Sequence, residues 1–134
     1  MYAIENIERR ASEVLLMRFS QAWSERDLAG VMACFHRDAV YHASVGPLPG
    51  ERAEGHQAIS RLVTRMFAYD EGAVTRIRSK FFTGEAAWWR WSYHLPSGEV
   101  RYGCDYFDFR GGLIALKDAY RKTADNQAPR RINP

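Results

Sequence analysis

Apolar residues in the first half of the chain recur at steps of three and four, which is the spacing of one face of an α-helix. The pattern predicts a long amphipathic helix over about residues 4–25 and, after an N-cap at Asp27, a short helix over residues 28–35. A third helix is predicted to begin near His56 and to end at residues 70–72. The first and third apolar faces consist of Ile4, Ile7, Ala11, Val14, Leu15, Phe19, Ala22, Trp23 and of Ala58, Ile59, Leu62, Val63, Met66, Phe67.

The second half of the chain alternates with the period of two that is typical of β-strands. A short strand over residues 38–42 precedes the third helix, and a strand over residues 74–82 follows it. Residues 85–95 and 100–109 then form a hairpin, and Gly111-Gly112 turns the chain into a last strand that ends at Arg121. Helices followed by antiparallel strands predict an α+β domain with helices on one face of a curved sheet.

The first hairpin carries the most informative pattern. We expect a two-residue loop, Ser97-Gly98, and this loop length fixes which residues lie opposite one another. One face is then aromatic, and the other is charged, so the charged face is either an outer surface or the wall of a pocket. The aromatic face pairs Trp89 with Tyr106, Trp91 with Cys104 and Tyr93 with Tyr102, and the charged face pairs Trp88 with Phe107, Arg90 with Asp105, Ser92 with Gly103 and His94 with Arg101.

Composition excludes several classes of protein. The 134 residues, 46% hydrophobic, suit one domain over residues 1–122 with a polar tail over residues 123–134. We expect a cytoplasmic protein, because the chain contains neither a signal-peptide pattern nor an apolar stretch of ~18 residues. The net charge of +3 is scattered, so we expect no nucleic-acid partner. Cys34 and Cys104 are expected to be reduced thiols.

The order of short motifs resembles that of the nuclear transport factor 2-like superfamily, in its SnoaL-like and ketosteroid-isomerase-like branch. The resemblance spans roughly residues 10–122. It is carried by Phe19-Ser20-Gln21-Ala22-Trp23, Asp27, Phe35, Asp38-Ala39-Val40-Tyr41, Glu54-Gly55-His56-Gln57-Ala58-Ile59, Gly103-Cys104-Asp105-Tyr106-Phe107-Asp108-Phe109, Gly112-Leu113-Ile114 and Lys117-Asp118-Ala119-Tyr120.

The resemblance implies a cystatin-like cone, in which three helices pack on a bent sheet around an internal pocket. Enzymes of the family carry a functional aspartate at the position of Asp105, directed into the cone. The charged face of the hairpin would then be the inner face. The aromatic face would lie outside and would form a homodimer contact through Trp89, Trp91, Tyr93, Tyr102 and Tyr106.

The implied site is a cofactor-independent acid–base centre. Asp105 would carry the proton and Arg90 would keep it ionised, while His94, Tyr41 or Asp118 would assist. We expect no cofactor and no metal, because His36, His42 and His56 lack accompanying carboxylates. The pocket for an apolar, cyclic metabolite would be lined by Phe19, Trp23, Trp88, Ser92, Phe107, Phe109 and Tyr120.

Two alternatives stay open at this stage. Asp105, Arg90 and Asp118 resemble the triad of limonene-epoxide-hydrolase-like relatives, but the second aspartate of that motif falls on Ala119 and its arginine on Gly103. Ketosteroid isomerase chemistry is rejected, because its base and its oxyanion tyrosine fall on Ala43 and Phe19. The protein is therefore either an isomerase, cyclase, dehydratase or epoxide hydrolase, or a non-catalytic ligand-binding or dimeric module with a structural Arg-Asp pair.

Overall fold

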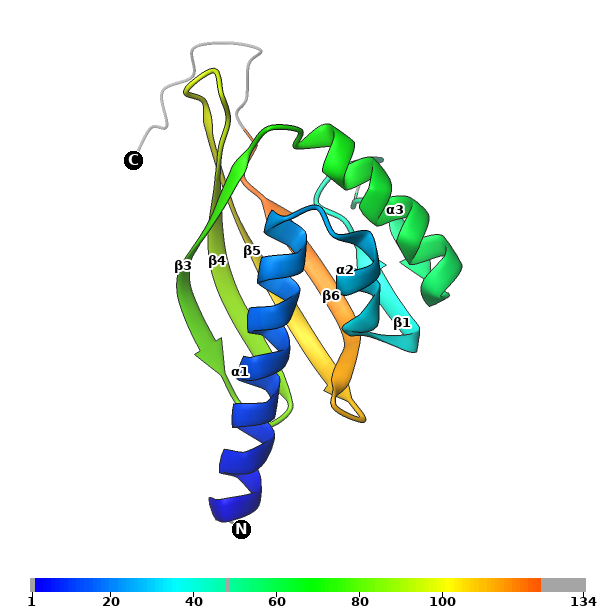
Figure 1. The fold of residues 1–134 in the computed structure, drawn as a ribbon, viewed down its shortest axis with the longest axis vertical. Helices are drawn as coiled ribbons and strands as arrows, with labels where there is room; N and C mark the ends of the chain where they lie inside the picture. The colour runs from blue at the N-terminus through cyan, green and yellow to red at the C-terminus, as the bar shows by residue number, and fades with distance from the viewer. Residues whose placement is uncertain (1, 48, 124–134) are drawn as a thin grey trace, which may run out of the picture.

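Three helices cover one face of a six-stranded sheet (Figure 1). The computed structural model describes residues 2–47 and 49–123, so the predicted tail lies outside the described residues except for Thr123. The α+β class is confirmed. The elements are α1 (Tyr2–Ser24), α2 (Leu28–Ala33), β1 (Phe35–His42), β2 (Arg52–Glu54), α3 (Gly55–Tyr69), β3 (Val74–Phe82), β4 (Ala86–His94), β5 (Val100–Arg110) and β6 (Leu113–Arg121).

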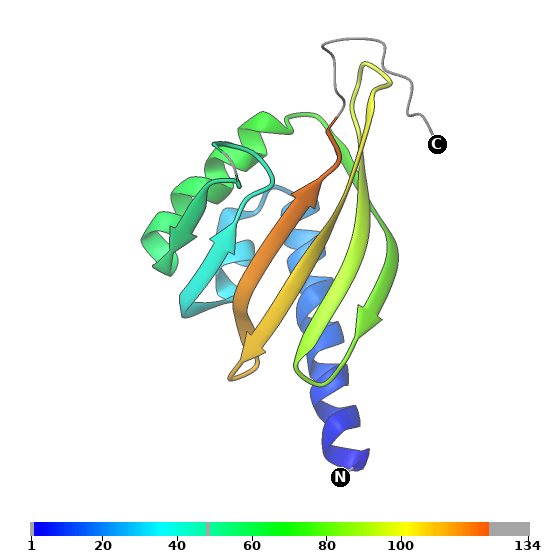
Figure 2. The same cartoon turned by 180° about the vertical axis from the view of Figure 1, so that it is seen from behind.

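The strands lie in the order β2-β1-β6-β5-β4-β3. Neighbouring strands are antiparallel except β1 and β6, which run parallel. This parallel pair, seen from behind in Figure 2, places Tyr41 directly opposite Lys117. The sequence pattern predicted neither β2 nor the pairing of β1 with β6, because both depend on contacts between distant segments.

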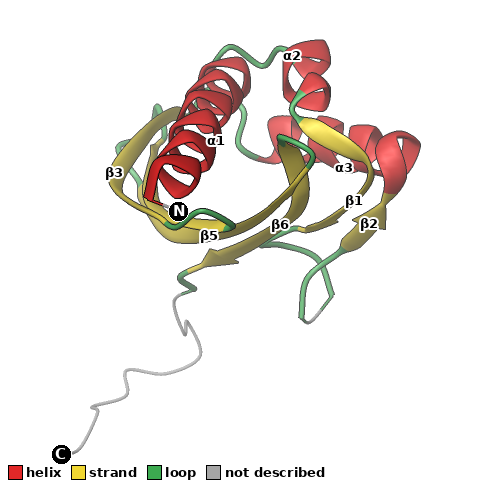
Figure 3. Cartoon of the chain, turned by 90° about the horizontal axis from the view of Figure 1, so that it is seen from below, coloured by secondary structure: helices red, strands yellow, loops and turns green. Residues whose placement is uncertain are grey.

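The sheet curves around α1, as the view from below shows (Figure 3). The apolar stripe predicted for this helix is buried in that curve at Leu15, Phe19 and Trp23. The stripe does not remain buried along the whole helix. The N-terminal part of α1 extends beyond the sheet (Figure 1), and Ile4 and Ile7 are 62% and 68% exposed.

The two shorter helices form where the sequence predicted them. The Asp27 carboxylate caps α2 by accepting from the backbone N–H of Gly30 at 3.0 Å. This helix ends earlier than predicted, and Phe35 begins β1. Ile59, Leu62, Val63 and Met66 of α3 are buried, as their spacing predicted. Within the described residues, no helix has an apolar stretch long enough to cross a membrane.

The predicted register of the first hairpin is wrong by one residue. Leu95 pairs with Glu99, so the loop contains three residues, and Gly98 takes a φ of +91°. A three-residue loop with a left-handed residue at its end is a common hairpin connection, and glycine tolerates that backbone. Trp89 consequently lies opposite Asp105 and Arg90 lies opposite Cys104.

This one-residue change exchanges the two faces of β4. Trp89, Trp91 and Tyr93 point into the cone and are only 4–6% exposed. They share the inner face with Asp105 and Phe107, which point inward as predicted. The expectation that the aromatic stripe of β4 lies outside is therefore wrong.

The second hairpin has the predicted Gly111-Gly112 turn, but a bulge follows it. Arg110 pairs with Leu113, and the register then shifts between Asp108 and Phe109. Beyond the bulge, Asp105 lies opposite Ala119, whereas Asp118 lies opposite Tyr106 on the outer face. Asp118, which was expected to assist Asp105, therefore lies on the other face of the sheet, and Ala119 takes the inner position.

Candidate functional site

Asp105 lies inside the cone, near the middle of β5, and is 4% exposed. The indole N–H of Trp89 donates to its Oδ2 atom at 2.7 Å. The ammonium nitrogen of Lys117 lies 3.5 Å from its Oδ1 atom. The carboxylate implied by the family resemblance is therefore buried in the cone, and its partners are Trp89 and Lys117 rather than Arg90.

Lys117 is the cation of this site, although no sequence pattern assigned it a role. Its ammonium group is buried and lies 4.5 Å from the ring centre of Tyr41 and 4.9 Å from that of Trp23. Burial lowers the pKa of Lys117, and the Asp105 carboxylate acts in the opposite direction. Lys117 precedes Ala119, the position of the motif aspartate, by two residues. Since alternate residues of a strand share a face, this spacing could have revealed it.

The space beside the Asp105–Lys117 pair is small. Its volume is about 20 Å³, roughly the room of one water molecule. Ser20 of α1 and Thr75 and Ile77 of the edge strand β3 are its partly exposed members, so it comes nearest to solvent between these two elements. The lining consists of Phe19, Ser20, Trp23, Thr75, Ile77, Trp89, Trp91, Tyr93, Asp105 and Lys117.

One polar group in this lining stands out. The hydroxyl oxygen of Thr75 is buried and has no hydrogen-bond partner within the described residues. Buried polar atoms are nearly always paired, because an unpaired one keeps its full desolvation cost. Thr75 therefore offers a donor and an acceptor to a molecule that enters this space.

Two buried tyrosines border the ion pair. Burial raises the pKa of Tyr41 well above its usual value, and the charges of Tyr93 and Asp105 raise it further. The pKa of Tyr93 is raised by burial first and then by Asp105. Both phenols stay protonated at neutral pH. The predicted position of Tyr41 inside the pocket is matched by its burial against Trp23 and Phe35.

Several predicted pocket residues lie on the outer face instead, because the hairpin register differs. Arg90 is exposed and donates to the Ser79 hydroxyl at 2.9 Å. His94 lies 2.9 Å from the hydroxyl of Ser92, which is buried beneath the side chains of the outer face. Trp88 is 46% exposed. None of these four residues can act on Asp105 from inside the cone.

Asp118 and Tyr120 lie on the opposite side of the sheet from Asp105. The Tyr120 hydroxyl donates to Asp118 at 2.8 Å, and Tyr120 is 52% exposed. Inside the cone, the place of a second acid is taken by Ala119. A side chain at Gly103 would collide with the Trp91 ring and the Tyr120 carbonyl, so no arginine fits there. The hydrolase triad is therefore absent, and Phe19, Trp23, Phe107 and Phe109 are the predicted lining residues that face inward.

A second buried ion cluster joins the residue that follows α3, Asp70, to the start of β5 and the end of β6. Asp70 is 1% exposed and receives two hydrogen bonds from the guanidinium of Arg121, at 2.9 and 2.8 Å. Arg101 lies 3.3 Å from the same carboxylate. The Arg121 guanidinium also lies 5.2–5.3 Å from the ring centres of Tyr69, Trp91 and Tyr93. No sequence pattern indicated this cluster, because its members are far apart along the chain.

No metal centre is apparent in the described part of the chain, where no three His, Cys, Asp or Glu side chains are grouped to hold an ion. Of the three histidines considered from the sequence, His36 and His42 lie on β1 and His56 lies in the first turn of α3. His36 lies beside Arg110, and His56 contacts the Phe35 carbonyl at 2.8 Å.

Solved structures with a similar fold share low sequence identity with this chain. An NTF2-like protein of unknown function from Mesorhizobium loti is 24% identical, with a TM-score of 0.74 over 86% of this chain and 93% of the other. A provisionally assigned ketosteroid isomerase from Kribbella flavida is 17% identical, with a TM-score of 0.75 over 93% and 87%. A provisionally assigned polyketide cyclase from Xanthomonas campestris is 22% identical, with a TM-score of 0.63 over 84% and 91%.

These likenesses establish the NTF2-like, cystatin-like fold, with neighbours that include isomerase and cyclase assignments. None of the curated proteins matches the chain. The model of the SnoaL-like domain matches residues 16–117, which is most of the sequence and spans the helix of Phe19 through the strand of Lys117. The chain belongs to the SnoaL-like domain family.

Proposed function

We propose that the cone of this protein is a cofactor-independent proton-transfer site for a small carbonyl metabolite. Asp105 accepts a proton from carbon next to the carbonyl, and Lys117 stabilises the negative charge that develops on the carbonyl oxygen. The observation that carries this proposal is the buried pair itself. It places a base and a cation 3.5 Å apart in an aromatic cone.

The incomplete pairing of Asp105 supports this role. Its Oδ2 atom is held by Trp89, whereas Oδ1 has only the long contact with Lys117. A carboxylate oxygen has more acceptor capacity than one long contact uses. Burying such a pair costs desolvation energy that one long contact repays poorly. Proton transfer at Oδ1 would explain why the protein keeps the pair of Asp105 and Lys117.

The size of the cavity limits the substrate. A space of about 20 Å³ does not hold a ring, so any ligand larger than water enters only when the lining side chains move. Ser20, Thr75 and Ile77 are the partly exposed lining residues and form the natural entrance. A small open-chain carbonyl compound therefore fits better than the cyclic metabolite expected from the sequence.

The same small volume favours a second candidate, a non-catalytic module with a structural ion pair. The cone is filled by Trp23, Trp89, Trp91 and Tyr93, with Met66 also in the core. Trp88, in contrast, lies outside the cone. In this candidate Asp105 and Lys117 only position the strands.

Hydrogen–deuterium exchange at carbon separates the two candidates. We would incubate the protein in D₂O with hydroxyacetone and with 2-cyclohexenone and follow loss of the α-proton signals by ¹H NMR. The proposal expects exchange above background, which Asp105→Asn reduces by about 10²–10⁴-fold. Hydroxyacetone is expected to react faster, because it is smaller.

Asp118→Asn is the matched control, since it removes the same charge from the outer face of the sheet. It is expected to exchange at the wild-type rate. Equal exchange by the wild type and Asp105→Asn for both ketones would contradict the catalytic proposal and favour the structural pair.

We further propose that a second copy of the chain covers the lower outer face of the sheet. The predicted contact residues Trp89, Trp91 and Tyr93 are buried in the cone and cannot take part. The other two predicted contact residues, Tyr102 and Tyr106, lie on the outer face, and Phe81 and Trp88 join Tyr106 in the proposed contact. Phe81 is 74% exposed, and the rings of Trp88 and Tyr106 lie 4.8 Å apart. Adjacent exposed aromatic rings of this kind mark interaction sites.

Light scattering tests this contact. A dimer mass at micromolar concentration that falls to a monomer mass in Trp88→Arg would support it. A wild-type monomer would contradict it.

A further inference from the structure

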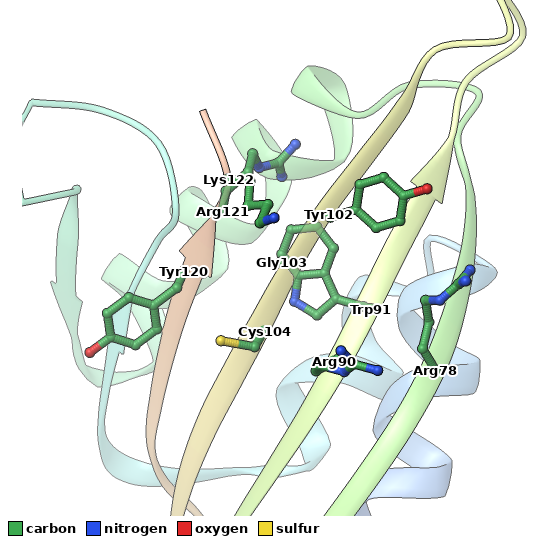
Figure 4. Close-up of a pocket in the computed structure, with 9 residues that line it drawn as sticks. All are labelled: Arg78, Arg90, Trp91, Tyr102, Gly103, Cys104, Tyr120, Arg121 and Lys122. Carbon is green, nitrogen blue, oxygen red and sulfur yellow. The ribbon is translucent and has the colours of Figure 1, made fainter. Parts of the chain in front are cut away.

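A hollow of about 470 Å³ lies on the upper outer face of the sheet, behind the cone (Figure 4). Cys104 lies at its centre and is flanked by the longer side chains of Arg90 and Tyr120, its direct partners on β4 and β6. Tyr102 is two residues away on the same face of β5. A short side chain surrounded by long ones produces the depression.

The walls of this hollow are basic. Arg78, Arg90 and Lys122 line it, and no aspartate or glutamate is among its lining residues. In the described part of the chain, no carboxylate lies within salt-bridge distance of these three cations, whereas most of the other arginines there have one. These three cations therefore form no ion pair within the described residues, whereas the fourth lining cation, Arg121, is paired with Asp70. The carboxylate beside the wall, Asp118, accepts a hydrogen bond from Tyr120 at 2.8 Å.

Two aromatic rings complete the wall. Tyr102 and Tyr120 are 46% and 52% exposed, and the Arg78 guanidinium lies 5.8 Å from the ring centre of Tyr102. Exposed tyrosines supply flat apolar contact at little entropic cost. Cations and rings thus border one space of a size usual for small-molecule sites.

From this arrangement we infer that the hollow bounded by Arg78, Arg90, Tyr102, Tyr120 and Lys122 binds a small aromatic carboxylate. The carboxylate lies between the arginines and Lys122, and the ring of the ligand stacks against the tyrosines. The site is separate from Asp105, which lies on the inner face of the sheet. It does not depend on the proposed proton transfer.

Isothermal titration with 2-naphthoate, and with uncharged 2-naphthamide of the same shape, tests this site. The carboxylate is expected to bind about tenfold more tightly than the amide, with an affinity that falls as salt is raised. Arg90→Gln and Lys122→Gln are each expected to weaken 2-naphthoate binding by about two- to fivefold. Tyr102→Ala is expected to weaken the binding of both compounds, because it removes a stacking surface.

The matched control is Arg61→Gln, which removes an exposed arginine from α3 on the opposite side of the sheet and should leave binding unchanged. Equal affinity for the acid and the amide, or no effect of Arg90→Gln and Lys122→Gln, would overturn the inference. So would loss of binding in Asp105→Asn, because the ligand would then occupy the cone. If binding weakens as protein concentration rises, a second copy occupies the hollow and the inference is wrong.

Discussion

Two buried aspartates in this protein have very different partners. Asp70 receives two short hydrogen bonds from Arg121, at 2.9 and 2.8 Å, and a third contact from Arg101 at 3.3 Å. Asp105 receives one short bond, from Trp89, and a contact of 3.5 Å from Lys117. Both carboxylates are at most 4% exposed.

The difference indicates two tasks. A bidentate arginine leaves Asp70 little capacity for another molecule and fixes the end of α3 against β6. Asp105 keeps an oxygen that is only loosely engaged, beside the small cavity of the cone. We therefore interpret Asp70 as a structural clamp and Asp105 as the working carboxylate, and each of the following variants tests that distinction.

The largest expected effect is that of Asp70→Asn on stability. Removing this charge leaves Arg121 buried without its partner, which should lower the free energy of unfolding by about 3–5 kcal/mol. Urea denaturation measures the loss. Glu71→Gln, at the exposed neighbouring position, should stay within about 0.5 kcal/mol of the wild type. A loss below 1 kcal/mol for Asp70→Asn would show that Asp70 is not a clamp.

The next effect concerns the pair in the cone. Lys117→Met leaves Asp105 as a buried charge and should cost about 3 kcal/mol, near the lower limit for a broken buried pair because the contact is long. Asp105→Asn combined with Lys117→Met removes both charges. The free energy of unfolding of this double variant should lie within about 1 kcal/mol of the wild-type value.

Urea denaturation of the wild type, the two single variants and the double variant completes a double-mutant cycle. The double variant should also fail in the deuterium-exchange assay. Recovery of stability without recovery of exchange would separate function from structure at this pair. If stability did not recover, the pair would act as a clamp like Asp70.

The third effect is on the pH dependence of stability. The pKa of Lys117 is lowered in the folded state, so between that pKa and about 10.5 the unfolded state binds the extra proton. The contribution of Lys117 to the free energy of unfolding therefore rises with pH in that window, by at most about 1.4 kcal/mol per pH unit. The difference in unfolding free energy between the wild type and Lys117→Met should grow as the pH approaches 10.5.

Above pH 10 the buried tyrosines act in the opposite direction. The pKa values of Tyr41 and Tyr93 are raised, so the unfolded state loses their protons first and stability falls. Tyr93→Phe should reduce this alkaline loss. A Lys117→Met difference that stays flat from pH 7 to pH 10.5 would contradict a lowered pKa for Lys117.

Local patterns predicted most of the elements. The N-cap at Asp27, the face of α3 and the Gly111-Gly112 turn each depend on residues close in the chain, and all three were found. Strand register depends instead on one residue more or less in a loop or bulge. The three-residue loop at Gly98 was enough to exchange the faces of β4.

Only part of the site was predicted, because the rest depends on strand register. The position of Asp105 came from a motif on its own strand and is correct in orientation. Lys117 and Trp89 reach it from neighbouring strands, so their roles required the register. Asp70 and Arg121 lie 51 residues apart, and no pattern of the sequence links them.

The smallest expected effect is that of Asp118→Asn, which extends the comparison to a third aspartate. This carboxylate lies on the outer face and accepts one hydrogen bond from the exposed Tyr120, so its loss should change the free energy of unfolding by no more than about 0.5 kcal/mol. Thermal unfolding and deuterium exchange measured on the same sample would check both properties. If Asp118→Asn abolished exchange while Asp105→Asn did not, the working carboxylate would lie outside the cone. The loose pairing of Asp105 would then have no bearing on function.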